Sequence, residues 1–219
     1  MVPAVTRFLL LDTDEQLADF GAAFPTAVAD ARGRGFGTKD HAARLVLPFL
    51  LRPPHAHEPI ETYRSRLSLQ FRSYCIVLLQ AGAMAMGWWD EGLLVRHKAQ
   101  KRYVVRGNGR AQTTHLRTRG KSRYGSRLRL QNWLLLLADV NGRLVEWQEE
   151  LGEPEQVFLA AGPRATAALW AQDPPPPFRR EDARLRRIPA HVHVPDHEEL
   201  LRVQRWLTTG QLALPALPG

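Results

Sequence analysis

The chain has 219 residues, of which 44% are hydrophobic, and a formal net charge of +8. This apolar content supports a buried core and excludes global disorder, and no apolar run reaches the roughly 20 residues of a membrane-spanning helix. The N-terminus lacks the basic and apolar regions of a signal peptide. We therefore expect a soluble, cytoplasmic protein that has no membrane contact and whose positive charge suits a polyanionic partner.

The single cysteine, Cys75, lies in the apolar run 74–79. A lone cysteine cannot form a disulfide within the chain, which fits a reducing compartment. No activating neighbour is visible in the sequence, so we interpret Cys75 as a small buried hydrophobic residue and not as a nucleophile.

The N-terminal part of the sequence predicts a helical extension followed by a linker. Residues 5–11 favour a short strand, and the Asp12-Thr13 pair can cap a helix. A second helix is expected over residues 38–51 because the prolines that follow it would end it. Residues 52–59 are then the linker.

Short runs of strand-forming residues come next, separated by turn signals. Ala81-Gly82 and the segment 90–92 stand where tight hairpin connections are expected. The pattern predicts an antiparallel meander of three or four strands, over residues 75–80, 83–89, 93–98 and 101–106.

A long helix is expected over residues 122–150, and its leucine and tryptophan stripe from Leu128 to Trp147 is typical of core packing. The remaining elements are a strand over 157–161, a helix over 164–172, a strand over 185–188 and a helix over 198–208. Together these elements predict an α/β domain, in which a mixed sheet contains the antiparallel meander and helices pack over it.

The interval between Glu91 and Asp139 contains no acidic residue. A segment this positive repels itself in a compact fold unless it stays solvated or meets a polyanion. We therefore expect contact with RNA. The candidate RNA-binding residues are Arg96, Lys98, Lys101, Arg102, Arg106, Arg110, His115, Arg117, Arg119, Lys121 and Arg123.

A glycine-rich segment with one glutamine lies inside this interval. Gly107 and Gly109 are candidate hinges of a low-bulk tip, because glycine accepts backbone conformations that other residues avoid. Gln112 supplies two hydrogen-bond donors and one acceptor site without charge. Its amide can orient a water molecule or a hydroxyl against an electrophile, although it cannot act as a general base at neutral pH. We take Gln112 as the candidate catalytic residue.

The segment from Gln80 to His115, with Arg-Gly-Asn-Gly-Arg-Ala-Gln over residues 106–112, resembles the release-factor-like domain of the Vms family of ribosome quality control. That domain is related to the middle domain of archaeal and eukaryotic class I peptide release factors. The resemblance implies a minimal bacterial form with release-factor-like, RNase H-like layering. With the linker over residues 52–59, the expected division is a helical N-terminal extension and linker (1–60), a release-factor-like catalytic domain (61–210) and a tail (211–219).

The resemblance also implies an activity, which is to free the nascent chain from stalled peptidyl-tRNA on the large ribosomal subunit. The protein would act as a monomer, without a metal or other cofactor. Gln112 would either position water at the ester carbonyl or help a ribose 2′-hydroxyl attack the adjacent phosphodiester near the tRNA 3′ end. Release factors place two glycines directly before the glutamine, where this chain has Arg110-Ala111, and both reactions stay open. The alternative is a non-catalytic module that binds rRNA or tRNA.

Other residue groups have simpler interpretations. His191, His193 and His197 are of a type that binds metals, but ordinary surface histidines are the simpler interpretation because only Asp196 stands out as a further ligand. Trp88-Trp89 are expected in the core and not as platforms for RNA bases. A metal-dependent nuclease is disfavoured, because such a site needs clustered carboxylates and the expected strands carry none.

Overall fold

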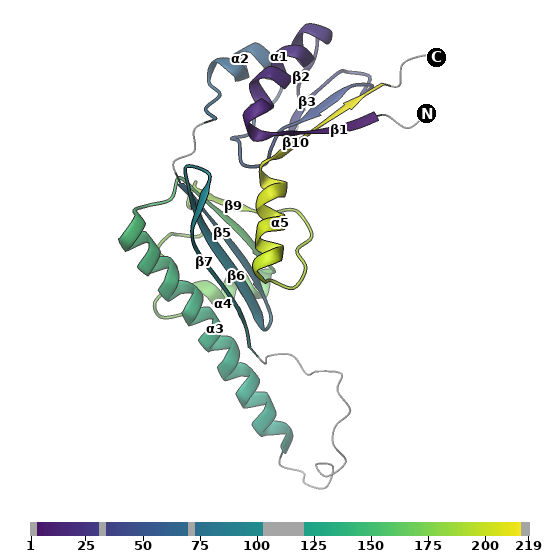
Figure 1. The fold of residues 1–219 in the computed structure, drawn as a ribbon. Helices are drawn as coiled ribbons and strands as arrows, with labels where there is room; N and C mark the ends of the chain where they lie inside the picture. Colours follow the sequence, from purple (N-terminus) through teal and green to yellow (C-terminus); the bar gives the residue numbers. More distant parts are fainter. Residues whose placement is uncertain (1–3, 31–33, 70–72, 103–120, 216–219) are drawn as a thin grey trace. The chain divides into compact units, whose positions relative to one another are not determined.

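The computed structural model describes residues 4–30, 34–69, 73–102 and 121–215 (Figure 1). Contacts between Cα atoms divide the chain into two units. One contains residues 1–70 together with 202–219, and the other contains residues 71–201. Each unit has its own five-stranded sheet.

The first unit is an antiparallel sheet with two α-helices, in the strand order β1-β10-β4-β3-β2. Its core includes Leu17, Phe20, Phe36, Leu45 and Tyr63. Its elements are β1 (Ala4–Leu9), the 3-10 helix η1 (Leu10–Asp12), α1 (Thr13–Ala23), β2 (Val28–Ala29), β3 (Gly35–Gly37), β4 (Arg44–Val46), α2 (Ile60–Ser65) and β10 (Thr209–Leu214).

The helix predicted over residues 38–51 is wrong, because this stretch contains β4. Thr38 closes the β3–β4 connection, with its hydroxyl accepting a hydrogen bond from Ala43 N at 3.2 Å. Leu45 is then buried opposite Phe36 in the sheet. The extension is therefore not helical throughout. The expected tail is also in part a strand, since β10 pairs with both β1 and β4.

The second unit contains the predicted mixed sheet, in the order β7-β6-β5-β8-β9. The meander β5–β6–β7 is antiparallel, whereas β8 runs parallel to β5 and to β9. The α/β class and the mixed sheet with its meander are thus confirmed. The elements are β5 (Ser73–Gln80), β6 (Ala83–Asp90), β7 (Leu93–Lys101), α3 (Lys121–Leu151), β8 (Gln156–Ala161), α4 (Pro163–Trp170), β9 (Leu185–Arg187) and α5 (His197–Leu207). The boundary between the two units falls within α5.

The β6–β7 connection is the tight turn that the sequence predicts. Glu91 and Gly92 both have positive φ, 47° and 82°, as a type I′ hairpin turn requires. β7 continues to Lys101 without the break expected after Lys98. The fourth run of the predicted meander, 101–106, otherwise lies largely outside the described residues.

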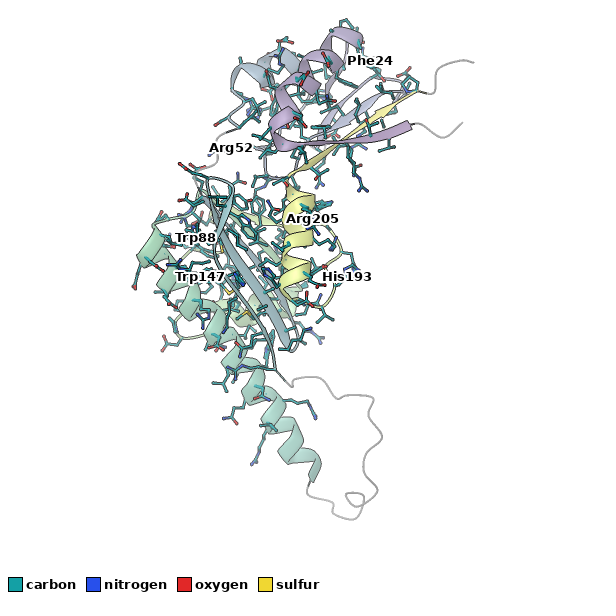
Figure 2. All side chains as sticks on the ribbon, viewed as in Figure 1. Phe24, Arg52, Trp88, Trp147, His193 and Arg205 are labelled. Carbon is teal, nitrogen blue, oxygen red and sulfur yellow. The ribbon has the colours of Figure 1, made fainter. Side chains whose placement is uncertain are left out.

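Both faces of this sheet are covered, because α3 and α4 pack on one side and α5 begins on the other (Figure 1). Trp88 of β6 and Trp147 of α3, both labelled in Figure 2, belong to the cluster under α3. Trp89 points to the opposite face and is also buried, which confirms both tryptophans of the 88–89 pair as core residues.

Helix α3 is longer than the face that it covers, and Figure 1 shows it continuing beyond the sheet. Among the side chains of α3 that the structure describes, from Arg127 onward, Leu136 is the first that is fully buried, and Trp133 is partly buried against the core. We call residues 121–135 the arm, which corresponds to about 22 Å of helix. Leu130 is 59% exposed and Leu134 43% exposed, so the expectation that the apolar stripe packs in the core from Leu128 onward is wrong for these leucines, although Trp133 packs against the core cluster.

Candidate nucleic-acid interface

The structure describes only part of the predicted site. Arg96, Lys98 and Lys101 lie on β7, and Arg102 follows it directly. Lys121 and Arg123 lie in the first turn of α3, where only the backbone is described. The candidate catalytic Gln112 lies outside the described residues, as do Arg106, Gly107, Gly109, Arg110, His115, Arg117 and Arg119.

β7 is an edge strand, and its side chains alternate between two environments. Register with β6 places Arg96 opposite Trp88 and Gln100 opposite Met84, both of which pack under α3. The intervening residues, such as His97 and Lys101, point to the opposite face.

On the α3 side, Arg102 and Arg96 each meet a carboxylate of the helix. Arg102 Nη2 donates to Asp139 Oδ2 at 2.7 Å, and Arg96 forms an ion pair with Glu150. Gln100 completes the first of these contacts. In the amide orientation that satisfies both of its polar atoms, its nitrogen donates to Asp139 Oδ2 at 3.0 Å and its oxygen accepts from Arg102 Nε at 2.8 Å.

On the other face, Lys101 Nζ lies 3.4 Å from Asp196 Oδ2, just before α5. The backbone N–H of Glu199 donates to Asp196 Oδ1 at 3.0 Å. This hydrogen bond, aided by Lys101, lowers the pKa of the Asp196 carboxyl below its ordinary value. The rings of His97 and His197 lie 4.5 Å apart between their centroids.

Arg96, Lys101 and Arg102 therefore have acidic partners, although the interval that contains them has no acid of its own. The sequence could not show this, because Asp139 is 37 residues from Arg102 and Asp196 is 95 residues from Lys101. Exposed pairs of this kind contribute little to stability, about 0–1 kcal/mol. They nevertheless balance the charge of β7 locally, so the strand offers less free positive charge than its composition indicates.

The histidines do not gather as a metal site. His191 and His193 lie 5.0 Å apart between ring centroids, and His193 Nδ1 is 3.1 Å from Glu199 Oε2. His197 contacts His97 instead. Among the described residues, no group of three or more His, Cys, Asp or Glu side chains could hold a metal ion.

Cys75 is completely buried in the cluster under α3. Burial raises the pKa of its thiol far above the ordinary value, so the reactive thiolate is suppressed at neutral pH. The interpretation of Cys75 as a core residue is confirmed. In the same described part of the chain, no helix is long and apolar enough to cross a bilayer.

The mixed sheet, its basic edge strand β7 and the long helix α3 lie within a region that matches a family of release factors. Residues 74–214 match the family model described as "Bacteroidetes VLRF1 release factor". The match covers more than half of the chain, and the protein therefore belongs to this family. The match confirms the predicted resemblance to release-factor-like domains, and it confirms the prediction that the chain is a bacterial form of them.

The chain is also similar to solved structures. One similar structure is titled "Vms1 mitochondrial localization core", with 15% sequence identity and a TM-score of 0.49. The likeness covers 96% of this chain and 82% of that one. A comparison with curated proteins gave no match.

Proposed function

We propose that the protein is a ribosome-associated release factor that frees nascent chains from stalled peptidyl-tRNA on the large ribosomal subunit. The observation that carries this proposal is the family match over residues 74–214. The matched region contains Gln112 and the acid-free basic interval around it. On this proposal the protein acts in the cytoplasm, as a monomer, and catalysis belongs to the unit of residues 71–201.

The arrangement of β7 and α3 supports this role. The segment 103–120 connects the end of an edge strand to the tip of the arm. The part of α3 that continues beyond the sheet (Figure 1) is a single helix, which is narrow enough to enter a confined RNA-lined cavity. The sheet and the helices that cover it form a layered body, which is too wide to enter such a cavity.

Gln112 is the proposed catalytic residue in either of two reactions. In ester hydrolysis, its amide orients water toward the carbonyl carbon of the peptidyl ester, and the bond from that carbon to the ribose oxygen breaks. The products are a peptide carboxylate and a tRNA that ends in a free hydroxyl. In strand cleavage, a ribose 2′-hydroxyl attacks the neighbouring phosphorus and displaces the 5′ oxygen. The peptide then leaves attached to a tRNA fragment.

RNA contact is proposed for the whole basic interval, with the main contribution from residues beyond Arg102. Phosphates are held by arginine and lysine, and each contact releases counterions from the RNA. Lys98 is the basic residue of β7 for which the described residues provide no acidic partner. The paired residues of β7 contribute only where RNA displaces their carboxylates.

The experiment that tests the proposal is a single-turnover assay with purified stalled large subunits carrying labelled peptidyl-tRNA. Release of the peptide supports the proposal, and the tRNA 3′ end distinguishes the two reactions. An intact terminal adenosine indicates ester hydrolysis, whereas a shortened tRNA with a cyclic phosphate indicates strand cleavage. Binding without release would leave a non-catalytic RNA-binding module.

A further inference from the structure

The place where α3 leaves the sheet is marked by a polar cluster of Gln100, Arg102 and Asp139. Leu136 and Leu137, the first fully buried residues among the described side chains of the helix, lie within one turn of Asp139. On its N-terminal side, Trp133 still packs against the core cluster, whereas Leu128, Leu130, Leu134 and Leu135 of the arm are exposed. The cluster is therefore at the pivot about which the arm would swing.

The cluster joins the helix to the sheet through both side chains and backbone. Arg102 donates to Asp139 at 2.7 Å, and the Gln100 amide bridges the two residues. The backbone N–H of Arg102 donates to Gly82 O at 2.8 Å, which fixes this residue to the β5–β6 turn. Asp139 is thus tied to a part of the sheet that cannot move independently.

Small changes at this pivot become large at the tip of the arm. Lys121, the first residue of α3, is 18 residues from Asp139, which corresponds to about 27 Å of helix. A rotation of about 10° at the pivot would move the tip on the order of 5 Å over this length. Misplacement of a catalytic group by about 1 Å can slow a reaction roughly 100-fold.

We propose that Gln100, Arg102 and Asp139 form a positioning cluster that sets the direction of the arm and thereby places the segment 103–120 for release. This proposal rests on the proposed function. Arg102 directly follows β7 and its N–H is bonded to Gly82 O, so the cluster also holds the end of that strand. Its role is mechanical, and none of its members needs to touch the bond that is cut.

The pair Arg96–Glu150 provides a matched control. It joins the same strand to the same helix, but at the far end of α3 from the arm. Asp139→Asn and Glu150→Gln each replace a carboxylate by the amide of the same shape, add one unit of positive charge and release one arginine, Arg102 just after β7 or Arg96 within it. A simple effect of charge on RNA binding would therefore appear in both variants, whereas loss of the pivot contact occurs only in Asp139→Asn.

In the single-turnover release assay, Asp139→Asn is expected to lower the maximal rate at least about tenfold. The subunit concentration that gives half the maximal rate should stay unchanged, because RNA contacts remain. Glu150→Gln should release at the wild-type rate. The charge-exchanged variant Arg102→Asp/Asp139→Arg should recover part of the loss. Equal rates for the two single variants would overturn the proposal.

A distance measurement tests the cluster without any release activity. Spin labels at Gln131→Cys on the arm and Ala99→Cys on β7, both exposed positions, report the direction of the arm. Buried Cys75 should not take up label. Asp139→Asn should broaden the distance distribution, and Glu150→Gln should leave it narrow. An unchanged distribution in Asp139→Asn would overturn the positioning role. If the distribution broadens but wild-type protein releases no peptide, the proposed function fails and the mechanical role of the cluster stands.

Discussion

The indole ring of Trp89 lies directly over Gly87. A Cβ added to Gly87 would stand 2.5 Å from Trp89 Cζ3 and 3.0 Å from Leu200 Cδ2. Trp89 and Leu200 are both buried. The glycine therefore provides the space in which the tryptophan and the start of α5 pack on this face of the sheet.

Gly87→Ala is expected to destabilise the protein by about 1–3 kcal/mol, because a packed core must shift to admit the methyl group. Urea unfolding followed by tryptophan fluorescence measures this change. Gly142→Ala on α3 is the control. No described atom lies within 4 Å of a Cβ at that position, and alanine favours a helix over glycine by about 1 kcal/mol. Equal destabilisation by both variants would contradict the close packing at Gly87.

The point at which α3 leaves the sheet predicts a sharp difference between two neighbouring leucines. Leu136 is completely buried and Leu134 is 43% exposed. Leu136→Ala should cost about 2–5 kcal/mol in the free energy of unfolding, whereas Leu134→Ala should stay within about 0.5 kcal/mol of the wild type. Denaturant titrations measure both. Similar costs would mean that the arm is packed and does not project.

Sequence patterns predicted elements whose signals are local. The β5–β6–β7 meander follows from its turn residues, and α3 was expected over 122–150 and observed at Lys121–Leu151. Features that depend on distant partners were missed. Thr209–Leu214 became a strand by pairing with β1 and β4. Leu134 is exposed because the helix is longer than the face that it covers, and the sequence of the helix does not show where that face ends.

The candidate site shows the same limit. The basic interval was evident because it depends on composition alone. Its acidic partners Asp139, Glu150 and Asp196 were not, because each reaches β7 from a later helix or its start. Only the folded chain brings these carboxylates to the strand.

Glu58 predicts a dependence of stability on pH. Hydrogen bonds from Arg66, at 2.8 and 2.5 Å, lower the pKa of the Glu58 carboxyl. Because the folded pKa lies below the unfolded value of about 4.3, the stabilisation is complete above that pH and is lost as the pH falls through the folded value. Glu58→Gln should cost about 1–3 kcal/mol at pH 7 and less at pH 3.

Urea midpoints at pH 7 and pH 3 measure this effect. Glu15→Gln, at an exposed position on α1, is the control and should change the midpoint little at either pH. A cost of Glu58→Gln that is the same at both pH values would show that the ion pair does not contribute as described.

Charge reversal of Arg117, Arg119 and Lys121 to Glu should weaken binding to large subunits and reduce its dependence on salt, since fewer counterions are released. Filter binding over a series of salt concentrations measures both quantities. Reversal of Arg7, Lys39 and Arg44 in the other unit makes the same change in net charge. If both triple variants weaken binding equally, total charge and not the basic interval determines binding.

The most direct test of the proposed function is Gln112→Ala in the single-turnover release assay, with Thr113→Ala as a matched change at the next residue. The amide of Gln112 is proposed to orient the attacking group, and loss of a comparable orienting hydrogen bond slows catalysis by about 10²–10³-fold. Gln112→Ala should therefore bind stalled large subunits as the wild type does but release peptide at least about 100-fold more slowly, while Thr113→Ala stays close to the wild type. Release by Gln112→Ala at the wild-type rate would contradict the proposed function.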